Sequence, residues 1–275
     1  MEFLKAILFG IIEGITEWLP ISSTGHMILL NEFINLNVSD EFYKLFEVVI
    51  QLGAIMAVVV LYFKTIFPWG FGKSKKETKD TLNLWGKIIV ACLPAAVIGI
   101  LLDDWLDAHL YNGVTVSLTL IIYGIIFIVI ESKNIGKRNI KDLNDISYKQ
   151  ALGVGGFQLL SLIPGTSRSG STIIGGLLLG LERSVASTFT FFLAIPVMAG
   201  ASLLKLAKYV MDVGFVFETS ELIILLIGCV VSFVISMVVI KYFMAYIKKH
   251  DFKVFGYYRI ILGLIVLGYF VLQML

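Results

Sequence analysis

Continuous apolar segments constrain this chain more than any other feature of its sequence. Hydrophobic residues make up 58% of the 275 residues, more than the core of a soluble protein can absorb. The apolar segments do not alternate with period two, and many are about as long as the roughly 20 residues that a membrane-crossing helix needs. The sequence therefore predicts an all-α integral membrane protein.

Two of the apolar segments are interrupted near their middle. Residues 3–36 break at Pro20, and residues 151–181 break at Pro164-Gly165, in each case next to a run of hydroxyl residues. Neither half of either segment has a comfortable length for crossing a bilayer. Broken backbone at membrane depth is tolerated only where protein or a cavity supports it. We therefore expect each segment to form a re-entrant helix–loop–helix hairpin.

Six further segments are long enough to cross the membrane. They lie at about 42–63, 86–102, 114–131, 186–207, 221–246 and 255–275. We expect one membrane domain made of two repeats, about 1–131 and about 150–275, joined by a basic linker at 132–149. Each repeat would hold one hairpin followed by three spans.

The charges of the loops predict how the chain is oriented. Residues 64–85, 132–149 and 247–254 are rich in lysine and arginine, which places them in the cytoplasm by the positive-inside rule. The acidic turn 103–113 and residues 208–220 then lie outside. This assignment works only if both interrupted segments return to the side they entered. The result is an inverted-topology repeat, in which binding sites lie near the repeat interface and the two broken loops should meet.

The first broken loop gathers groups that are costly to place inside a membrane. Residues 13–28 read EGITEWLPISSTGHMI, and ionisable groups at that depth mark a functional site by default. Glu13 and Glu17 are four residues apart, which puts both carboxylates on one helix face. Hydroxyl groups that can cap a new helix follow the proline and belong to Ser22, Ser23 and Thr24. His26 falls in the first turn of that helix.

The second broken loop carries a guanidinium among hydroxyl groups. Arg168 in PGTSRSGST needs an anion at membrane depth, and its planar fork suits phosphate oxygens. Glycines and exposed N–H groups that lead into a helix also favour an anion. We expect a phosphate group to be bound by Arg168 with hydroxyls from Ser22, Thr24, Thr166, Ser167, Ser169 and Thr172. The alternative is that Arg168 pairs with Glu13, Glu17 or Glu47 and only holds the repeats together.

Two glutamates beside a phosphate would repel it unless a cation intervenes or one is protonated. A Mg²⁺ or Ca²⁺ ion held by Glu13 and Glu17 is the economical solution, and a polar contact between helices is the alternative. His26 could attack phosphorus or protonate a leaving oxygen, or it could only be hydrogen-bonded. Glu47 and Gln51, four residues apart, could support the site or join two helices.

From the residues alone, the protein handles a phosphorylated, lipidic ligand, and hydrolysis and transport both stay open.

The segments EGITEWLPISSTGHM (13–27) and PGTSRSGST (164–172) resemble the two signature segments of the bacterial undecaprenyl-diphosphate phosphatases, the bacitracin-resistance family. FEVVIQLGAI (46–55) resembles a third shared segment. The resemblance implies a hydrolase that removes the terminal phosphate of undecaprenyl diphosphate. Its product is the lipid carrier for peptidoglycan and other wall polymers, and the activity confers bacitracin resistance.

The resemblance also implies site residues, a cofactor and a location. The matching positions are Glu13, Glu17, Ser22, Ser23 and His26 in the catalytic loop and Ser167 and Arg168 in the diphosphate-binding loop. The nucleophile stays open between His26, Ser23 and water. A divalent cation is expected, as is a multi-pass location in the bacterial cytoplasmic membrane with the site facing outward.

The expected partners are the polyprenyl diphosphate and membrane lipids, with a homodimer left open. The net charge of +2 is too small to indicate a nucleic-acid partner. The alternative function is a flippase or transporter of polyprenyl phosphates that uses the same inverted-repeat site, because inverted repeats with paired broken helices are common in carriers.

Overall fold

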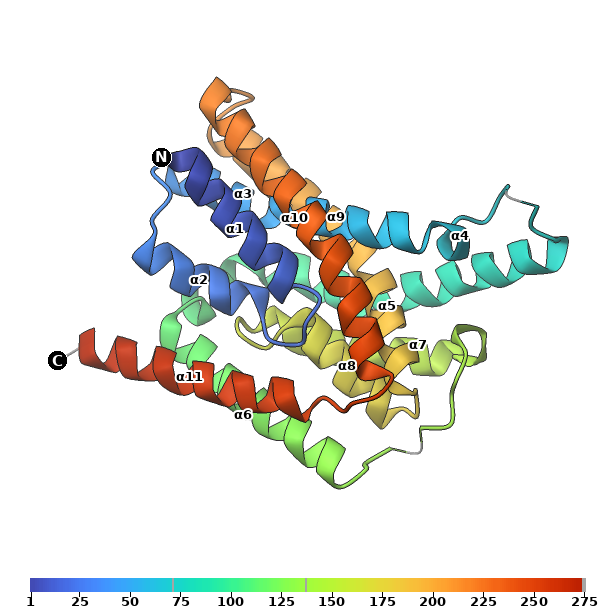
Figure 1. The fold of residues 1–275 in the computed structure, drawn as a ribbon. Helices are drawn as coiled ribbons and strands as arrows, with labels where there is room; N and C mark the ends of the chain where they lie inside the picture. The colour runs from blue at the N-terminus through green and yellow to red at the C-terminus, as the bar shows by residue number, and fades with distance from the viewer. Residues whose placement is uncertain (71, 137, 274–275) are drawn as a thin grey trace.

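The computed structural model describes residues 1–70, 72–136 and 138–273, and helices make up most of this part of the chain (Figure 1). The side chains at 103, 104, 107 and 273 are outside the description. Pairing of the β type is limited, within these residues, to one isolated bridge between Ile140 and Leu181. The expected all-α class is confirmed.

Six helices in the described residues are long and apolar enough to cross a membrane. They are α3 (Asp40–Leu61), α5 (Lys75–Leu110), α6 (Gly113–Ser132), α9 (Arg183–Asp212), α10 (Thr219–Ile247) and α11 (Lys253–Gln273). Several begin at a polar cap, as the Ser39, Ser74 and Asn112 side chains accept backbone N–H groups of the first turn. The six predicted spans are thereby confirmed, although residues 274 and 275 of the last one lie outside the described part.

The bounds of α5 differ most from the prediction. It was expected over 86–102, but it begins at Lys75 and continues through Pro94 to Leu110. Ser74 and Glu77 form a reciprocal capping box at its start, and α4 (Phe63–Ile66) precedes it. The expectation of loops at 75–85 and 103–110 was wrong. Charged residues end the apolar stretch without ending the helix, since many of them are good helix formers.

The two interrupted segments form helix–loop–helix hairpins. In the first, α1 (Glu2–Thr16) is followed by α2 (Ser23–Phe33). In the second, α7 (Tyr148–Gln158) and a 3-10 turn, η2 (Leu159–Leu162), lead to α8 (Arg168–Leu178). Figure 1 shows the hairpins entering the helix bundle from opposite sides, with their tips toward one another. With 11 residues each, α2, α7 and α8 are too short to cross a bilayer, and their re-entrance into the membrane stays a prediction.

The two hairpins share an unusual loop geometry. Ser22 and Ser167 have φ values of 73° and 74°, a region that residues other than glycine rarely adopt. Each serine is the N-cap of the helix that follows, accepting the amide of Gly25 at 3.3 Å or of Gly170 at 3.1 Å. In both hairpins the loop therefore ends in the same way, at a serine N-cap with a positive φ.

The last spans of the two predicted repeats, α6 and α11, lie side by side (Figure 1). A Cβ atom on Gly124 would lie 2.7 Å from the carbonyl oxygen of Gly256, and the reverse distance is also 2.7 Å. Gly113, at the start of α6, faces Phe270 near the end of α11, so the two helices run antiparallel. An inverted repeat requires this direction, and the inverted repeat itself stays a prediction.

Close helix packing positions both hairpins. Gly10 and Gly14 on α1 lie against the backbone of α10, and Gly155 on α7 lies against the backbone of α5 at Ala91. Added side chains would clash at these contacts, because the facing backbone occupies the space that a Cβ atom would need. The hairpins are thereby held between long spans, which fixes where their loops meet.

A buried ion cluster joins several segments at the basic end of the molecule. Glu131, near the end of α6, accepts hydrogen bonds from Arg138 at 2.9 Å and from Arg183 at 3.0 and 2.7 Å. The backbone N–H of Phe252 also donates to it, at 3.4 Å. This carboxylate therefore ties the linker, the start of α9 and the start of α11 to α6.

Candidate active site

An ion pair between the two hairpins lies at the centre of the site. Nη2 of Arg168 is 2.7 Å from Oε1 of Glu17, and the two side chains are only 10% and 5% exposed. Nη1 of Arg168 donates to the carbonyl of Thr190 at 2.7 Å, and the guanidinium lies 5.9 Å from the ring centroid of Trp18. The two broken loops thus meet, and the expected alternative of an Arg168–glutamate pair is present in the structure.

The Glu17 carboxylate also accepts a hydrogen bond from a serine hydroxyl. Oγ of Ser23 lies 2.5 Å from Oε2 of Glu17, so one carboxylate joins the hydroxyl of one hairpin to the guanidinium of the other. Ser23 is the first residue of α2, where the helix dipole favours negative charge. A carboxylate placed to take the proton of a hydroxyl is the arrangement that activates a nucleophile.

The His26 side chain is not part of the Glu17, Ser23 and Arg168 contacts. Its Nδ1 lies 2.7 Å from the carbonyl oxygen of Ser22, and its Nε2 lies 2.7 Å from the hydroxyl of Tyr258. The His26 and Tyr258 rings are stacked, with 5.6 Å between centroids. Both ring nitrogens are therefore engaged, and attack on phosphorus would require the Tyr258 hydrogen bond to break. Tyr258 lies in an apolar span, and its sequence context carried no signal for this role.

Glu13 is buried beside Glu17 without a donor of its own. It is 1% exposed, and neither carboxylate oxygen accepts a hydrogen bond from a described residue. Its carboxyl interacts electrostatically with those of Glu17 and Glu47 and with Arg168. Glu47 accepts the hydroxyl of Tyr43 at 2.9 Å. Gln51, one turn along α3, is half-buried, and no hydrogen bond from it to the site is described.

The unpartnered carboxylate of Glu13 indicates whether the expected divalent cation fits this site. No group of three or more His, Cys, Asp or Glu side chains suited to a metal occurs among the described residues. Mg²⁺ needs fewer protein ligands, since it is commonly held by one or two carboxylates, waters and substrate phosphates. The two unpartnered oxygens of Glu13 next to Glu17 fit that pattern. The residues present are therefore suitable, and the cation stays a prediction.

Most hydroxyls of the second loop are already engaged within the protein. Ser169 donates to the carbonyls of Glu17 at 3.1 Å and Leu19 at 3.3 Å. Thr172 donates to the carbonyl of Arg168 at 2.8 Å and accepts the Thr190 hydroxyl at 2.9 Å. The buried hydroxyl of Thr166 has no partner in the described part of the chain. It is thus a second-loop hydroxyl that the described part of the protein leaves without a hydrogen bond.

A second arginine, Arg259 on α11, holds the two loops together. Its side chain is fully buried. Nη1 donates to the carbonyl of Pro20 at 3.1 Å, and Nη2 donates to those of Gly165 at 2.8 Å and Thr166 at 3.0 Å. The guanidinium also lies 5.6 Å from the ring centroid of Tyr123.

Sequence reasoning missed Arg259, although a signal was present. A charged residue inside a predicted span is the same signal that identified Arg168. Arg259 lies in the predicted span 255–275, but no run of hydroxyl or glycine residues surrounds it. A motif search therefore passes over it, while a search for every charge at membrane depth would find it.

A cavity of about 360 Å³ lies next to the loops, between α5 and α9. Thr24 and Pro164 line it from the two loops, and Gln158 and Ser161 line it from the second hairpin. Its other walls are mostly small and apolar and include Ala95, Ala96, Gly99, Ile100, Val197, Gly200, Ala201 and Leu204. Its volume falls in the range of about 300–1,000 Å³ that is usual for small-molecule sites.

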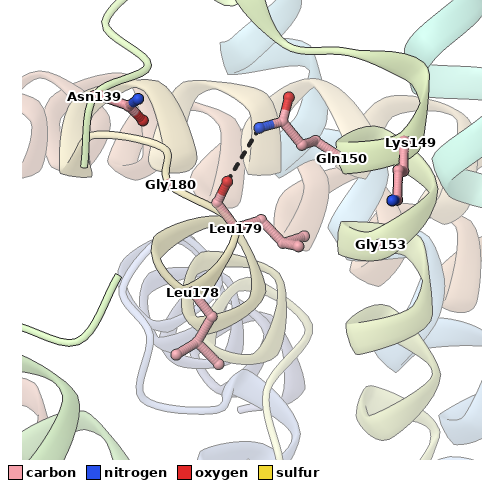
Figure 2. A pocket seen from close by; sticks show the side chains of 7 residues that line it. All are labelled: Asn139, Lys149, Gln150, Gly153, Leu178, Leu179 and Gly180. Carbon is pink, nitrogen blue, oxygen red and sulfur yellow. Dashed lines mark hydrogen bonds between the residues drawn. The ribbon is translucent and has the colours of Figure 1, made fainter. Parts of the chain in front are cut away.

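A larger hollow, of about 590 Å³, lies on the second hairpin away from the loops (Figure 2). It is lined by Asn139, Lys149, Gln150, Gly153, Leu178, Leu179 and Gly180. Figure 2 shows the Gln150 side chain, whose Nε2 donates to the carbonyl of Leu179 at 3.1 Å and so holds α7 against the end of α8. None of the predicted site residues lines this hollow, so its size does not make it the candidate active site.

Comparison with known proteins adds a family to this geometry. Residues 6–265 match the family model described as "Bacitracin resistance protein BacA". The chain belongs to this family. Curated relatives named undecaprenyl-diphosphatase include that of Acetivibrio thermocellus, 58% identical over 98% of both chains. That of Enterococcus faecalis is 58% identical over 97% of this chain and 96% of the relative. That of Desulfitobacterium hafniense is 60% identical over 98% and 96%, respectively.

Membership of the BacA family confirms the resemblance seen in the two broken loops. Both signature segments, 13–27 and 164–172, fall within the matched range 6–265. The relatives align along nearly their whole length with this chain. The likeness therefore extends beyond the motifs to the spans that position them.

Proposed function

We propose that the protein is an undecaprenyl-diphosphatase, which removes the terminal phosphate of undecaprenyl diphosphate and releases undecaprenyl phosphate. Relatives of that name are 58% to 60% identical to this chain over nearly its full length. One observation in the site carries the proposal. The Glu17 carboxylate joins the Ser23 hydroxyl at 2.5 Å and the Arg168 guanidinium at 2.7 Å, which places a base, a nucleophile and an anion-binding group together.

The geometry favours Ser23 as the nucleophile. Glu17 takes the Oγ proton as Oγ forms a bond to the terminal phosphorus, and the bond from that phosphorus to the bridging oxygen breaks. The lipid monophosphate leaves, and water then hydrolyses the phosphoserine to release phosphate. Arg168 stabilises the negative charge of the transferring group. Its Nε has no partner among the described residues and is free to donate to a phosphate oxygen.

Glu13 and Glu17 are the residues that would hold a divalent cation, Mg²⁺ or Ca²⁺. Such an ion, when bound, neutralises phosphate oxygens and lets two carboxylates lie beside an anionic substrate. Glu17 itself orients the Ser23 hydroxyl, and its carboxylate is anchored by Arg168. His26 and water remain the alternative nucleophiles, and His26 would first have to leave Tyr258.

The cavity supports an outward-facing site in the bacterial cytoplasmic membrane. It extends from the loops along α5 to Tyr111 and along α9 to Leu204, toward the end of the bundle opposite the basic loops. Its small, apolar lining suits part of a prenyl chain, whose remainder would lie in the bilayer among membrane lipids. Release of the monophosphate on this face would return the carrier to peptidoglycan synthesis and would also counter bacitracin.

The antiparallel packing of α6 and α11 favours a second candidate, a flippase or transporter of polyprenyl phosphates. Inverted repeats with broken helices are a recurring design of carriers. A carrier, however, does not need a hydroxyl that is activated by a carboxylate. The contact between Ser23 and Glu17 gives this site such a hydroxyl, which a hydrolase does need. Hydrolysis is therefore the function that the site supports best.

Phosphate release from a short-chain polyprenyl diphosphate, measured on protein in detergent, tests the proposal because transport has no meaning in a micelle. We expect release by the wild type with added Mg²⁺ or Ca²⁺. We expect a loss of roughly 10²- to 10⁴-fold in kcat for Glu17→Gln, the usual contribution of a catalytic base. Glu182→Gln, at a half-buried position on the basic end, is the matched control. If the wild type releases no phosphate, the carrier is favoured. If Glu17→Gln keeps the wild-type kcat, Glu17 is not the catalytic base.

A further inference from the structure

Gln158 is a buried amide that the protein leaves without hydrogen bonds. It is the last residue of α7 and is fully buried. Neither its Oε1 nor its Nε2 has a partner in the described part of the chain. Buried polar groups are almost always paired, because an unmade hydrogen bond costs more than a made one contributes. A partner from outside the protein is therefore expected at this amide.

The position of Gln158 in its hairpin corresponds to that of Glu13 in the other. Gln158 precedes Ser167 by nine residues, and Glu13 precedes Ser22 by nine residues. These two serines share the positive φ and the capping role in their loops. The corresponding carboxylate and amide are both buried and both unpartnered. The two hairpins thus place a similar buried group at corresponding positions, a carboxyl in one and an amide in the other.

Gln158 belongs to the lining of the cavity next to the loops. It lines the cavity together with Thr24 of the first loop and Pro164 of the second. Ser161 also lines it, but its hydroxyl is already donated to the carbonyl of Gln158 at 2.7 Å. The side-chain amide that the second hairpin leaves unpartnered in this lining, within the described residues, is therefore that of Gln158.

We propose that the Gln158 amide binds the inner phosphate of the substrate, the one that stays on the prenyl chain. This inference rests on the proposed function, which places the terminal phosphate at Ser23 and Arg168. The chain would lie in the apolar cavity, whose lining includes Gln158 together with Thr24 and Pro164 of the two loops. The inner phosphate joins this chain to the terminal phosphate at the loops. A neutral amide can donate to an anionic oxygen, whereas a carboxylate at this position would repel it.

A contact to a non-bridging oxygen of the inner phosphate, which neither gains nor loses a bond, is kept in the substrate, in the transition state and in the lipid product. Its loss should raise KM and leave kcat unchanged, since uniform binding is lost. For Gln158→Met, which keeps the side-chain length, we expect KM to rise roughly 10- to 100-fold, the value of one hydrogen bond to a charged group. Inhibition by the lipid monophosphate should weaken by the same factor, while inhibition by inorganic phosphate should not change.

Gln158→Glu should raise KM further than Gln158→Met, because it adds repulsion to the lost donor. Gln150→Met is the matched control, since Gln150 is a glutamine on the same helix that lies away from the loops and the cavity, and its KM should stay at the wild-type value. The thermal transition of Gln158→Met should not fall, since the variant removes an unpartnered buried amide. That result would separate lost binding from lost folding.

The inference is overturned if Gln158→Met keeps the wild-type KM and the wild-type inhibition by the lipid monophosphate. A buried water would then be the partner of the amide. It is also overturned if kcat falls while product inhibition stays the same. If the wild type releases no phosphate at all, the proposed function fails instead. Direct titration of the wild type and Gln158→Met with a short-chain polyprenyl monophosphate then still tests the amide, and equal affinities would count against it.

Discussion

Replacing Arg259 by methionine should separate the stability of this protein from the positioning of its site. Methionine keeps an unbranched stem but removes three hydrogen bonds, to the carbonyls of Pro20 at 3.1 Å, Gly165 at 2.8 Å and Thr166 at 3.0 Å. These carbonyls belong to both broken loops. We expect phosphate release to fall far more than the stability of the folded protein.

The magnitude follows from two opposing contributions to stability. Hydrogen bonds to a charged group contribute about 1.5–3 kcal/mol each, but burial of a guanidinium without a carboxylate partner costs several kcal/mol. Arg259 is fully buried, and its described polar partners are carbonyl oxygens. The net change in unfolding free energy should therefore be only about 1–2 kcal/mol. A shift of about 1 Å between catalytic groups, in contrast, can lower the rate roughly 10²-fold.

The assay combines kcat/KM for phosphate release with thermal unfolding in the same detergent. Arg183→Met is the matched control, since Arg183 donates to the buried Glu131 at 3.0 and 2.7 Å at the basic end, away from the loops. We expect the control to lose stability and keep kcat/KM. Arg259→Met should lose about 10²-fold in kcat/KM with a small change in transition temperature.

The reasoning on Arg259 is refuted if the methionine variant keeps kcat/KM near the wild-type value. It is equally refuted if activity falls only in proportion to the fraction of unfolded protein. In the first case the loops hold their positions without the guanidinium. In the second, Arg259 acts on global stability alone, and its contacts with Pro20 and Thr166 have no separate role.

Three further predictions concern the site itself. Arg168→Lys should lose roughly 10- to 100-fold in kcat/KM, because one ammonium cannot replace a planar fork, and near-normal kinetics would contradict this. Glu13→Gln should raise the Mg²⁺ or Ca²⁺ concentration needed for half-maximal activity, and an unchanged titration would show that Glu13 holds no cation. His26→Ala should still form a phosphoenzyme when the terminal phosphate is radiolabelled, with the label on Ser23. Label on His26 in the wild type would make histidine the nucleophile.

The meeting of the two loops could be predicted because ionisable groups in a membrane need partners. Glu17 and Arg168 lie in separate interrupted segments, and the loop charges require both segments to turn back. A pairing between the segments satisfies both residues. The Glu17–Arg168 distance of 2.7 Å agrees with that reasoning.

Other parts of the site depend on packing that sequence does not reveal. Tyr258 is one aromatic residue among many in apolar spans, and only the placement of α11 beside α2 brings it to His26. The extra length of α5 was missed because hydropathy reports where the bilayer ends, not where the helix ends. Gln158 is a neutral residue outside the polar run that identified the second loop, so its burial became visible only in the structure.

One turn of α11 has a consequence for how the protein is made. Arg259 contacts the carbonyls of both loops, and the adjacent Tyr258 contacts His26. Synthesis proceeds from the N-terminus, so both hairpins leave the ribosome before the segment that fixes their loops. The nascent chain would carry Glu17, Ser23 and Arg168 while their loops still lack that support. The chain would thus become able to bind substrate only when α11 has inserted. An incomplete chain in the membrane would be inactive.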